Sequence, residues 1–153
     1  MPPAYVKTCR DLLCYEAAKL EAVAARRPGD ARFILDRVKT LRVGPLRFDE
    51  VEDPARCLFD GIEAAPGGEW LVPLEKGGLE VASNLVPACE SCRASKGNRD
   101  VLAWYKDRRV RVPRAVWRRY LRAIYDTWEK QGILEGPVPA SEAKRWSTVD
   151  VER

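Results

Sequence analysis

Residues 68–97 read GEWLVPLEKGGLEVASNLVPACESCRASKG, and this stretch carries the most informative chemistry of the chain. Its second half contains the Cys-x-x-Cys pair formed by Cys89 and Cys92. Two cysteines at this spacing are typical of metal sites with thiolate ligands. The 153-residue chain contains no histidine. A histidine ligand and a histidine general base are therefore both excluded.

The five cysteines are odd in number, and the N-terminal sequence MPPAYVKTCRDLL has no apolar export segment. This combination favours free thiols or a metal site over a disulfide framework. Cys9 and Cys14 fall on an expected helix, where core packing is their predicted role. No apolar run approaches the length of a membrane span, about 18 residues. We therefore expect a cytoplasmic protein with no membrane partner, and the scarcity of Asn and Gln suggests a thermophilic source.

The length fits one compact domain with a hydrophobic core. We expect a single domain over residues 1–135, divided into N-terminal helices (1–45), a central core (57–99) and C-terminal helices (100–132). Apolar residues at helical spacing from Val6 to Ala24 predict a first helix that stops before residues 27–29. Further helices are expected over 31–42, 101–106 and 113–131, the last with proline at its start and glycine just past its end.

Short apolar pieces separated by glycine and proline between residues 57 and 78 predict a small hairpin, with Leu71 and Val72 in one strand. Helix is expected to return near Cys89. The tail over residues 136–153 either docks through Trp146 or is mobile, and the sequence leaves both alternatives open.

Four pieces of the middle third resemble the zinc-bearing HNH nucleases: CLFDG at 57–61, VPLEKGG at 72–78, NLVPACESC at 84–92 and KGNR at 96–99. The resemblance covers roughly residues 57–99. It implies an α+β fold, a mainly helical chain around an HNH-like ββα core that is treble-clef-like and contains a small β-hairpin. It also implies a family that binds one divalent cation and cleaves DNA.

The resemblance places four residues at the family's active-site positions: Glu69, Trp70, Asn84 and Arg93. Glu69 keeps the acidic metal ligand, and Asn84 keeps the residue that fixes the loop geometry. Trp70 replaces the general base, yet an indole N–H cannot accept a proton near neutral pH. Arg93 replaces the last metal ligand, and a guanidinium cannot coordinate a metal. We therefore expect a pseudo-nuclease without catalytic Mg²⁺ or Mn²⁺.

Alternatives remain for both replaced positions. Trp70 either marks a degenerate active site or is simply a core aromatic that fills the volume once shared by the histidine and the metal. Arg93 either faces and pairs with Glu69 or points to solvent.

The resemblance also predicts a structural zinc ion held by Cys57, Asp60, Cys89 and Cys92. Three thiolates and one carboxylate are a chemically reasonable zinc ligand set, because carboxylate oxygen also binds zinc. Alternatively, zinc has been lost and the thiols pack as small apolar groups.

Arginine is concentrated in the segment KDRRVRVPRAVWRRYLR at 106–122, where acidic residues are sparse. Such a face could follow a phosphate backbone, or it could simply be a solvated helix face. The expected DNA contacts are Lys96, Arg99, Arg108, Arg109, Arg111, Arg114, Arg118, Arg119 and Arg122.

Three functions follow from these observations. The first is an HNH-like protein that binds double-stranded DNA without cleaving it. The second is an active endonuclease with a relocated base. The third is an interaction module, either a homodimer or a partner of an active nuclease.

Overall fold

The computed structural model describes residues 2–44, 46, 48 and 53–152. In chain order the elements are α1 (Cys9–Ala24), α2 (Ala31–Leu41), β1 (Ala65–Trp70), the short 3-10 helices η1 (Leu74–Lys76) and η2 (Ala82–Asn84), β2 (Leu85–Ala88), α3 (Glu90–Lys96), α4 (Val101–Arg108), α5 (Arg114–Lys130) and α6 (Ala140–Ser147). The described residues therefore combine helices with one two-stranded antiparallel sheet, which confirms the mixed fold class. None of the helices in these ranges has both the length and the apolar character needed to cross a membrane.

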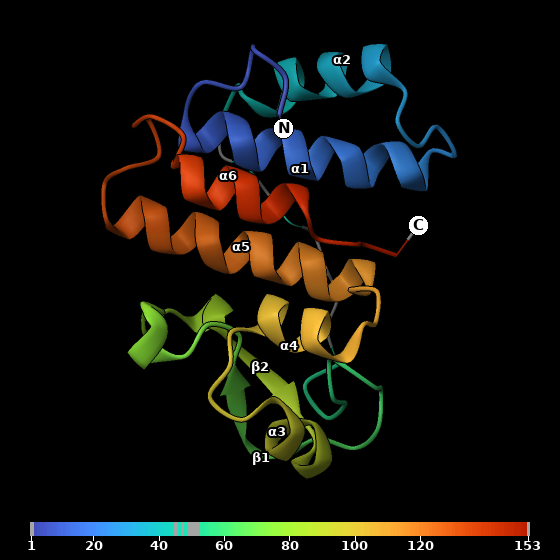
Figure 1. The fold of residues 1–153 in the computed structure, drawn as a ribbon, viewed down its shortest axis with the longest axis vertical. Coiled ribbons are helices and arrows are strands. Elements are labelled where there is room, and N and C mark those ends of the chain that lie inside the picture. Colours follow the sequence, from blue (N-terminus) through green and yellow to red (C-terminus); the bar gives the residue numbers. More distant parts are fainter. Residues whose placement is uncertain (1, 45, 47, 49–52, 153) are drawn as a thin grey trace.

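The helices and the sheet occupy different ends of the molecule. Figure 1 shows α2, α1, α6 and α5 following one another from one end, with the sheet and α3 at the other and α4 in between. α1 packs on both α2 and α5. The first and last thirds of the chain therefore share one hydrophobic core.

Side-chain caps explain where several helices begin. Thr8 Oγ1 accepts a hydrogen bond from the Asp11 amide at 3.0 Å, and Asp11 Oδ2 accepts one from the Thr8 amide at 3.1 Å. Asp30 caps α2 in the same manner, and Asp100 caps α4. These contacts satisfy backbone amides that the first helical turn leaves without a partner. The helices expected in both terminal thirds are present, with ends within a few residues of those predicted.

The two strands pair antiparallel in the register Ala65↔Ala88, Glu69↔Val86 and Trp70↔Leu85, which leaves a bulge in β1 over residues 66–68. Gly68 has a φ of +69°, and a Cβ at this position would lie 3.0 Å from the Val86 carbonyl oxygen. Glycine is therefore required where the bulge approaches β2.

The predicted strand at Leu71 and Val72 is wrong in position, because β1 ends at Trp70. Leu71 is fully buried in the main core. Its amide donates to the Asn84 carbonyl at 2.8 Å, and its carbonyl accepts from the Val101 amide at 3.0 Å. Packing against the start of α4 therefore draws these residues away from the sheet.

The C-terminal tail is docked, so the structure selects one of the two alternatives. Its helix α6 buries Trp146, which is 2% exposed. The Trp146 ring stacks on Trp128 with centroids 5.6 Å apart and meets Trp117 edge-on at the same centroid distance. After α6, the Val112 amide donates to the Asp150 carbonyl at 2.8 Å.

We predict that Trp146→Ala lowers the free energy of unfolding by about 3–5 kcal/mol, the usual cost of emptying a large aromatic site in a core. Ile62→Ala is the control, since Ile62 is 57% exposed, and it should cost under about 1 kcal/mol. Urea unfolding followed by circular dichroism measures both. A loss for Trp146→Ala as small as that of the control would contradict the docked tail.

Candidate metal centre

Four potential metal ligands converge next to the sheet: Cys57, Asp60, Cys89 and Cys92. Their ligand atoms all lie within 4.8 Å of one another. Cys57 and Asp60 come from the turn before β1, Cys89 follows β2, and Cys92 lies in the first turn of α3. The structure thus brings together all four predicted ligands.

Local hydrogen bonds hold this arrangement. Asp60 Oδ2 lies 3.1 Å from the sulfur of Cys89 and 3.2 Å from that of Cys92, while Asp60 Oδ1 accepts from the Ile62 amide at 3.0 Å. The Cys89 sulfur caps α3 by accepting from the Cys92 amide. The ligands are therefore preorganised by the turn and by the start of the helix.

The pKa values of the cluster follow from these contacts. Burial opposes ionisation of Asp60, but hydrogen bonds from the Ile62 amide and the neighbouring thiols lower the pKa of its carboxyl to about 2. Burial, with the Asp60 carboxylate nearby, raises the pKa of Cys92, and burial likewise raises the pKa of Cys57. Without a metal ion, the Asp60 carboxylate thus accepts hydrogen bonds from the Cys89 and Cys92 sulfurs.

This donor set fits a structural metal ion and is compatible with zinc. Tetrahedral zinc with bonds of about 2.0–2.3 Å places its ligand atoms roughly 3.3–3.8 Å apart, so only small adjustments of the ligand positions are needed. All four positions would be filled by protein. Such a closed site stabilises a fold and leaves no coordination position for a substrate or a reactive water.

The Asn84 side chain holds the loop between the two strands. Its side chain is 1% exposed. Asn84 Oδ1 accepts from the Val72 amide at 2.9 Å, and Nδ2 donates to the carbonyls of Val72 and Leu79 at 2.9 and 3.1 Å. The amide therefore fixes the loop that leaves β1.

The ion pair of Glu69 differs from the one predicted. The expected partner, Arg93, instead donates to the Pro66 carbonyl at 2.9 Å, on the bulge of β1. Glu69 faces Lys96, with Oε1 and Nζ 3.6 Å apart, and Lys96 Nζ also donates to the Trp70 carbonyl at 2.7 Å. Lys96 is 0% exposed, whereas Glu69 keeps some contact with solvent. Geometry therefore selects the ammonium, because it reaches both Glu69 and a backbone carbonyl.

Sequence reasoning missed this role of Lys96, although a signal was present. Cys92 and Lys96 are four residues apart on α3 and share one helix face. If Cys92 turns toward the hairpin to reach a metal, Lys96 must do so as well. Burial lowers the pKa of Lys96, and the nearby carboxylate of Glu69 opposes that shift.

Trp70 is half-buried at the end of β1 and does not belong to the main core as described. The alternative of a simple core aromatic therefore lacks support.

The residues expected to contact DNA have varied surroundings. Lys96 is fully buried and cannot reach a phosphate, so this expectation does not fit the structure. Arg99 pairs with Asp107, Arg108 lies over the Trp104 ring at 4.0 Å, and Arg111 pairs with Asp150. These three guanidinium groups already have partners.

The arginines on and near α5 differ in their contacts. Arg119 donates to the carbonyls of Ser83 and Leu85 at 3.0 and 3.1 Å and so attaches α5 to the sheet. Arg118 is half-exposed. Within the ranges that the structure describes, Arg109, Arg114 and Arg122 form no ion pair.

Comparison with known proteins adds no family, because no family model, curated protein or solved structure matches this chain.

We predict that Cys89→Ser and Asp60→Ala each weaken metal binding by at least tenfold, because each removes one of four ligands. Cys14→Ala is the matched control, since Cys14 is a fully buried thiol outside the cluster. That variant loses stability but keeps one metal ion per chain. Competition with a chromophoric zinc chelator gives the affinities. Equal affinities in all variants would exclude this site.

We also predict that Lys96→Met lowers the free energy of unfolding by about 2–4 kcal/mol, because it leaves Glu69 and a buried carbonyl without their partner. Arg93→Met should cost less than about 1 kcal/mol, because its contact is exposed. Urea unfolding of the zinc-loaded protein measures both changes. A larger loss of unfolding free energy for Arg93→Met than for Lys96→Met would contradict this assignment and indicate Arg93 as the main partner of Glu69.

Proposed function

We propose that this chain is a degenerate HNH-like module, stabilised by zinc, that binds double-stranded DNA and does not cleave it. The observation that carries the proposal is the ion pair between Lys96 and Glu69. By resemblance, Glu69 is the acid that would bind the catalytic cation. The ammonium of Lys96 lies 3.6 Å from it and is closed off from solvent. A fixed positive charge thus satisfies the carboxylate that a divalent cation would need.

The groups around this pair support the absence of cleavage. Phosphodiester hydrolysis at such a site needs a base to activate water and a cation to offset charge on the cleaved phosphate. Trp70 provides an indole where the base would stand, and Arg93 provides a guanidinium where the last ligand would stand. Neither side chain has a lone pair that can accept a proton or bind a metal at neutral pH.

The cluster of Cys57, Asp60, Cys89 and Cys92 supports the structural half of the proposal. When bound, zinc would supply charge and four bonds that join the turn before β1 to α3. The chain's own contribution is the preorganised set of three sulfurs and one carboxylate. This contribution does not depend on catalysis.

DNA is the proposed partner because of the charge left on α5. Arg114, Arg118 and Arg122 follow one another at intervals of four residues and therefore share one face of the helix. Arg114 and Arg122 have no carboxylate partner within the described ranges. Arg119 attaches the same helix rigidly to the sheet. A rigid row of cations is suited to successive backbone phosphates.

The test compares two double variants of equal charge. Arg114→Ala with Arg122→Ala should weaken binding to a DNA duplex and reduce the slope of log affinity against log salt by about two, one for each phosphate contact. Arg32→Ala with Lys39→Ala removes the same charge from exposed positions on α2 and should leave the slope nearly unchanged. Fluorescence anisotropy over a salt series provides both values. Equal losses in the two variants would indicate a non-specific effect of net charge and contradict the proposed surface.

The same preparations test cleavage. Plasmid incubated with the wild-type protein and Mg²⁺ or Mn²⁺ should stay supercoiled. Nicking that disappears in Glu69→Ala would show an active nuclease and refute the non-cleaving assignment.

A further inference from the structure

We infer that a pocket on the opposite side of α4 from the sheet binds a small organic anion with an apolar body. This inference is independent of the proposed nucleic-acid function. The pocket has a volume of about 520 Å³ and lies between α4, the connection from α4 to α5, and the end of α6 with the segment after it. Its size is within the range of small-molecule sites, about 300–1,000 Å³.

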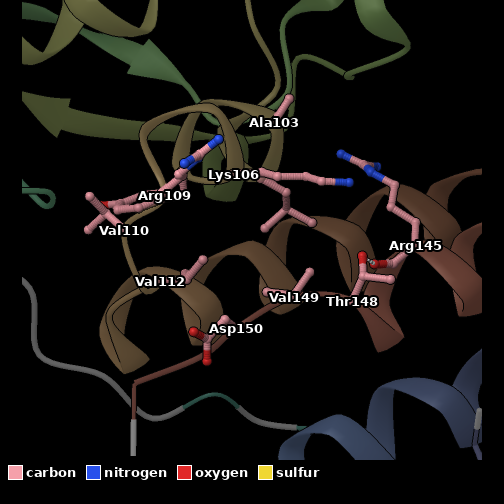
Figure 2. A pocket seen from close by; sticks show the side chains of 11 residues that line it. Ala103, Lys106, Arg109, Val110, Val112, Arg145, Thr148, Val149 and Asp150 are labelled. Carbon is pink, nitrogen blue, oxygen red and sulfur yellow. Dashed lines mark hydrogen bonds between the residues drawn. The ribbon is translucent and has the colours of Figure 1, made fainter.

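The floor of the pocket is apolar. Leu102 and Val112 are almost fully buried, and Val149 packs against the same core. Figure 2 shows Val112 and Val149 on the side of the pocket opposite α4. An apolar ligand group in contact with this floor would release water from both surfaces, which favours binding.

Three cationic side chains line the same pocket: Lys106, Arg109 and Arg145. In Figure 2, Lys106 extends toward the guanidinium of Arg145, and Arg109 lies on its other side. Like charges directed to one opening repel each other, and an anion between them removes that repulsion. The lining therefore favours a ligand with a negative group.

The nearby carboxylates of the protein do not neutralise all three of these cationic side chains. Arg145 is paired with Asp100 and Glu142. Within the described ranges, Lys106 and Arg109 form no ion pair. Of the described lining residues only Asp150 is acidic, and its carboxylate pairs with Arg111 at 3.4 Å. Two cations at the pocket mouth thus remain available for a ligand.

Charge and floor together define the ligand. A bare inorganic anion would leave the apolar floor in water, and an uncharged apolar molecule would leave the cations uncompensated. A carboxylate, sulfonate or phosphate ester attached to an aromatic or aliphatic body satisfies both. Such a ligand would also connect α4 to the segment after α6 and so raise the stability of the docked tail.

The test uses a pair of fluorescent probes with the same body. Anilinonaphthalene sulfonate carries one negative group, and phenylnaphthylamine is its uncharged counterpart. We expect the full chain to bind the sulfonate at least about tenfold more tightly. Lys106→Gln with Arg109→Gln should weaken sulfonate binding by about three- to tenfold, as expected for exposed ion pairs, and leave the uncharged probe unchanged.

Two further variants locate the binding. Val149→Phe fills the pocket floor and should weaken binding of both probes. Arg32→Gln removes an exposed charge on α2, outside the pocket, and should change neither. Circular dichroism checks that each variant is folded. If Val149→Phe does not fold, the Lys106 and Arg109 changes still decide the test.

Competition identifies the anionic group. Decanoate and naphthyl phosphate should displace the sulfonate, and the stronger competitor distinguishes a carboxylate from a phosphate ester as the preferred group. The inference is overturned if the two probes bind equally, if the sulfonate does not bind, if its affinity survives the double change, or if neither competitor displaces it.

Discussion

The cluster of Cys57, Asp60, Cys89 and Cys92 is the contact on which the arrangement of the sheet and α3 depends. This end of the molecule has only a small apolar cluster of its own, with Cys57, Ala88 and Cys89 as its buried members. Other apolar side chains here, such as Val86 and Phe59, pack with the main core, so this cluster by itself offsets little of the conformational entropy lost when the turn before β1 is ordered. A metal ion bound by four side chains would supply the missing free energy, because the site exists only in the folded chain. The two closely spaced cysteines and the distant turn would thereby be held in a fixed relative position.

Several contacts around this cluster join the sheet end of the molecule to the helices. Asn84 holds the loop after β1, and Arg119 joins α5 to the backbone beside β2. Phe59, in the turn that carries Asp60, meets the Trp104 ring of α4 edge-on with centroids 5.1 Å apart. The arginine row of α5 is therefore fixed relative to the sheet, which suits the DNA surface proposed above.

The cationic side chains of this chain differ in role according to whether a neighbouring group compensates their charge. Lys96 is buried against Glu69 and a carbonyl, so its charge is used inside the fold. Arg108 lies over an aromatic ring, which binds a cation without neutralising it. Arg109, Arg114 and Arg122 keep charges that no described carboxylate offsets. The amino-acid type is nearly the same in these cases, and only the surroundings decide whether a cation stabilises the protein or is available to a partner.

The sequence by itself determined the elements whose signals are local. Helical periodicity and its stop signals located α1, α2, α4 and α5 to within a few residues, because these signals depend on contacts between residues three and four apart, whereas α6 was not predicted. The resemblance of CLFDG and NLVPACESC to a zinc-bearing family identified the four candidate ligands that the structure brings together. By the same resemblance, Asn84 was assigned to the family position that fixes the loop geometry.

Only the tertiary structure decided which groups meet across the fold. Lys96 rather than Arg93 faces Glu69, because the contacts of Cys89 and Cys92 with Asp60 fix which side of α3 turns toward β1. Leu71 leaves the sheet because the buried start of α4 competes for it. Trp146 docks the tail, and with it the pocket beneath Lys106 and Arg109 forms from segments about 40 residues apart. These contacts depend on the relative placement of whole helices, which is determined by packing of the shared core and leaves no periodic trace in the sequence.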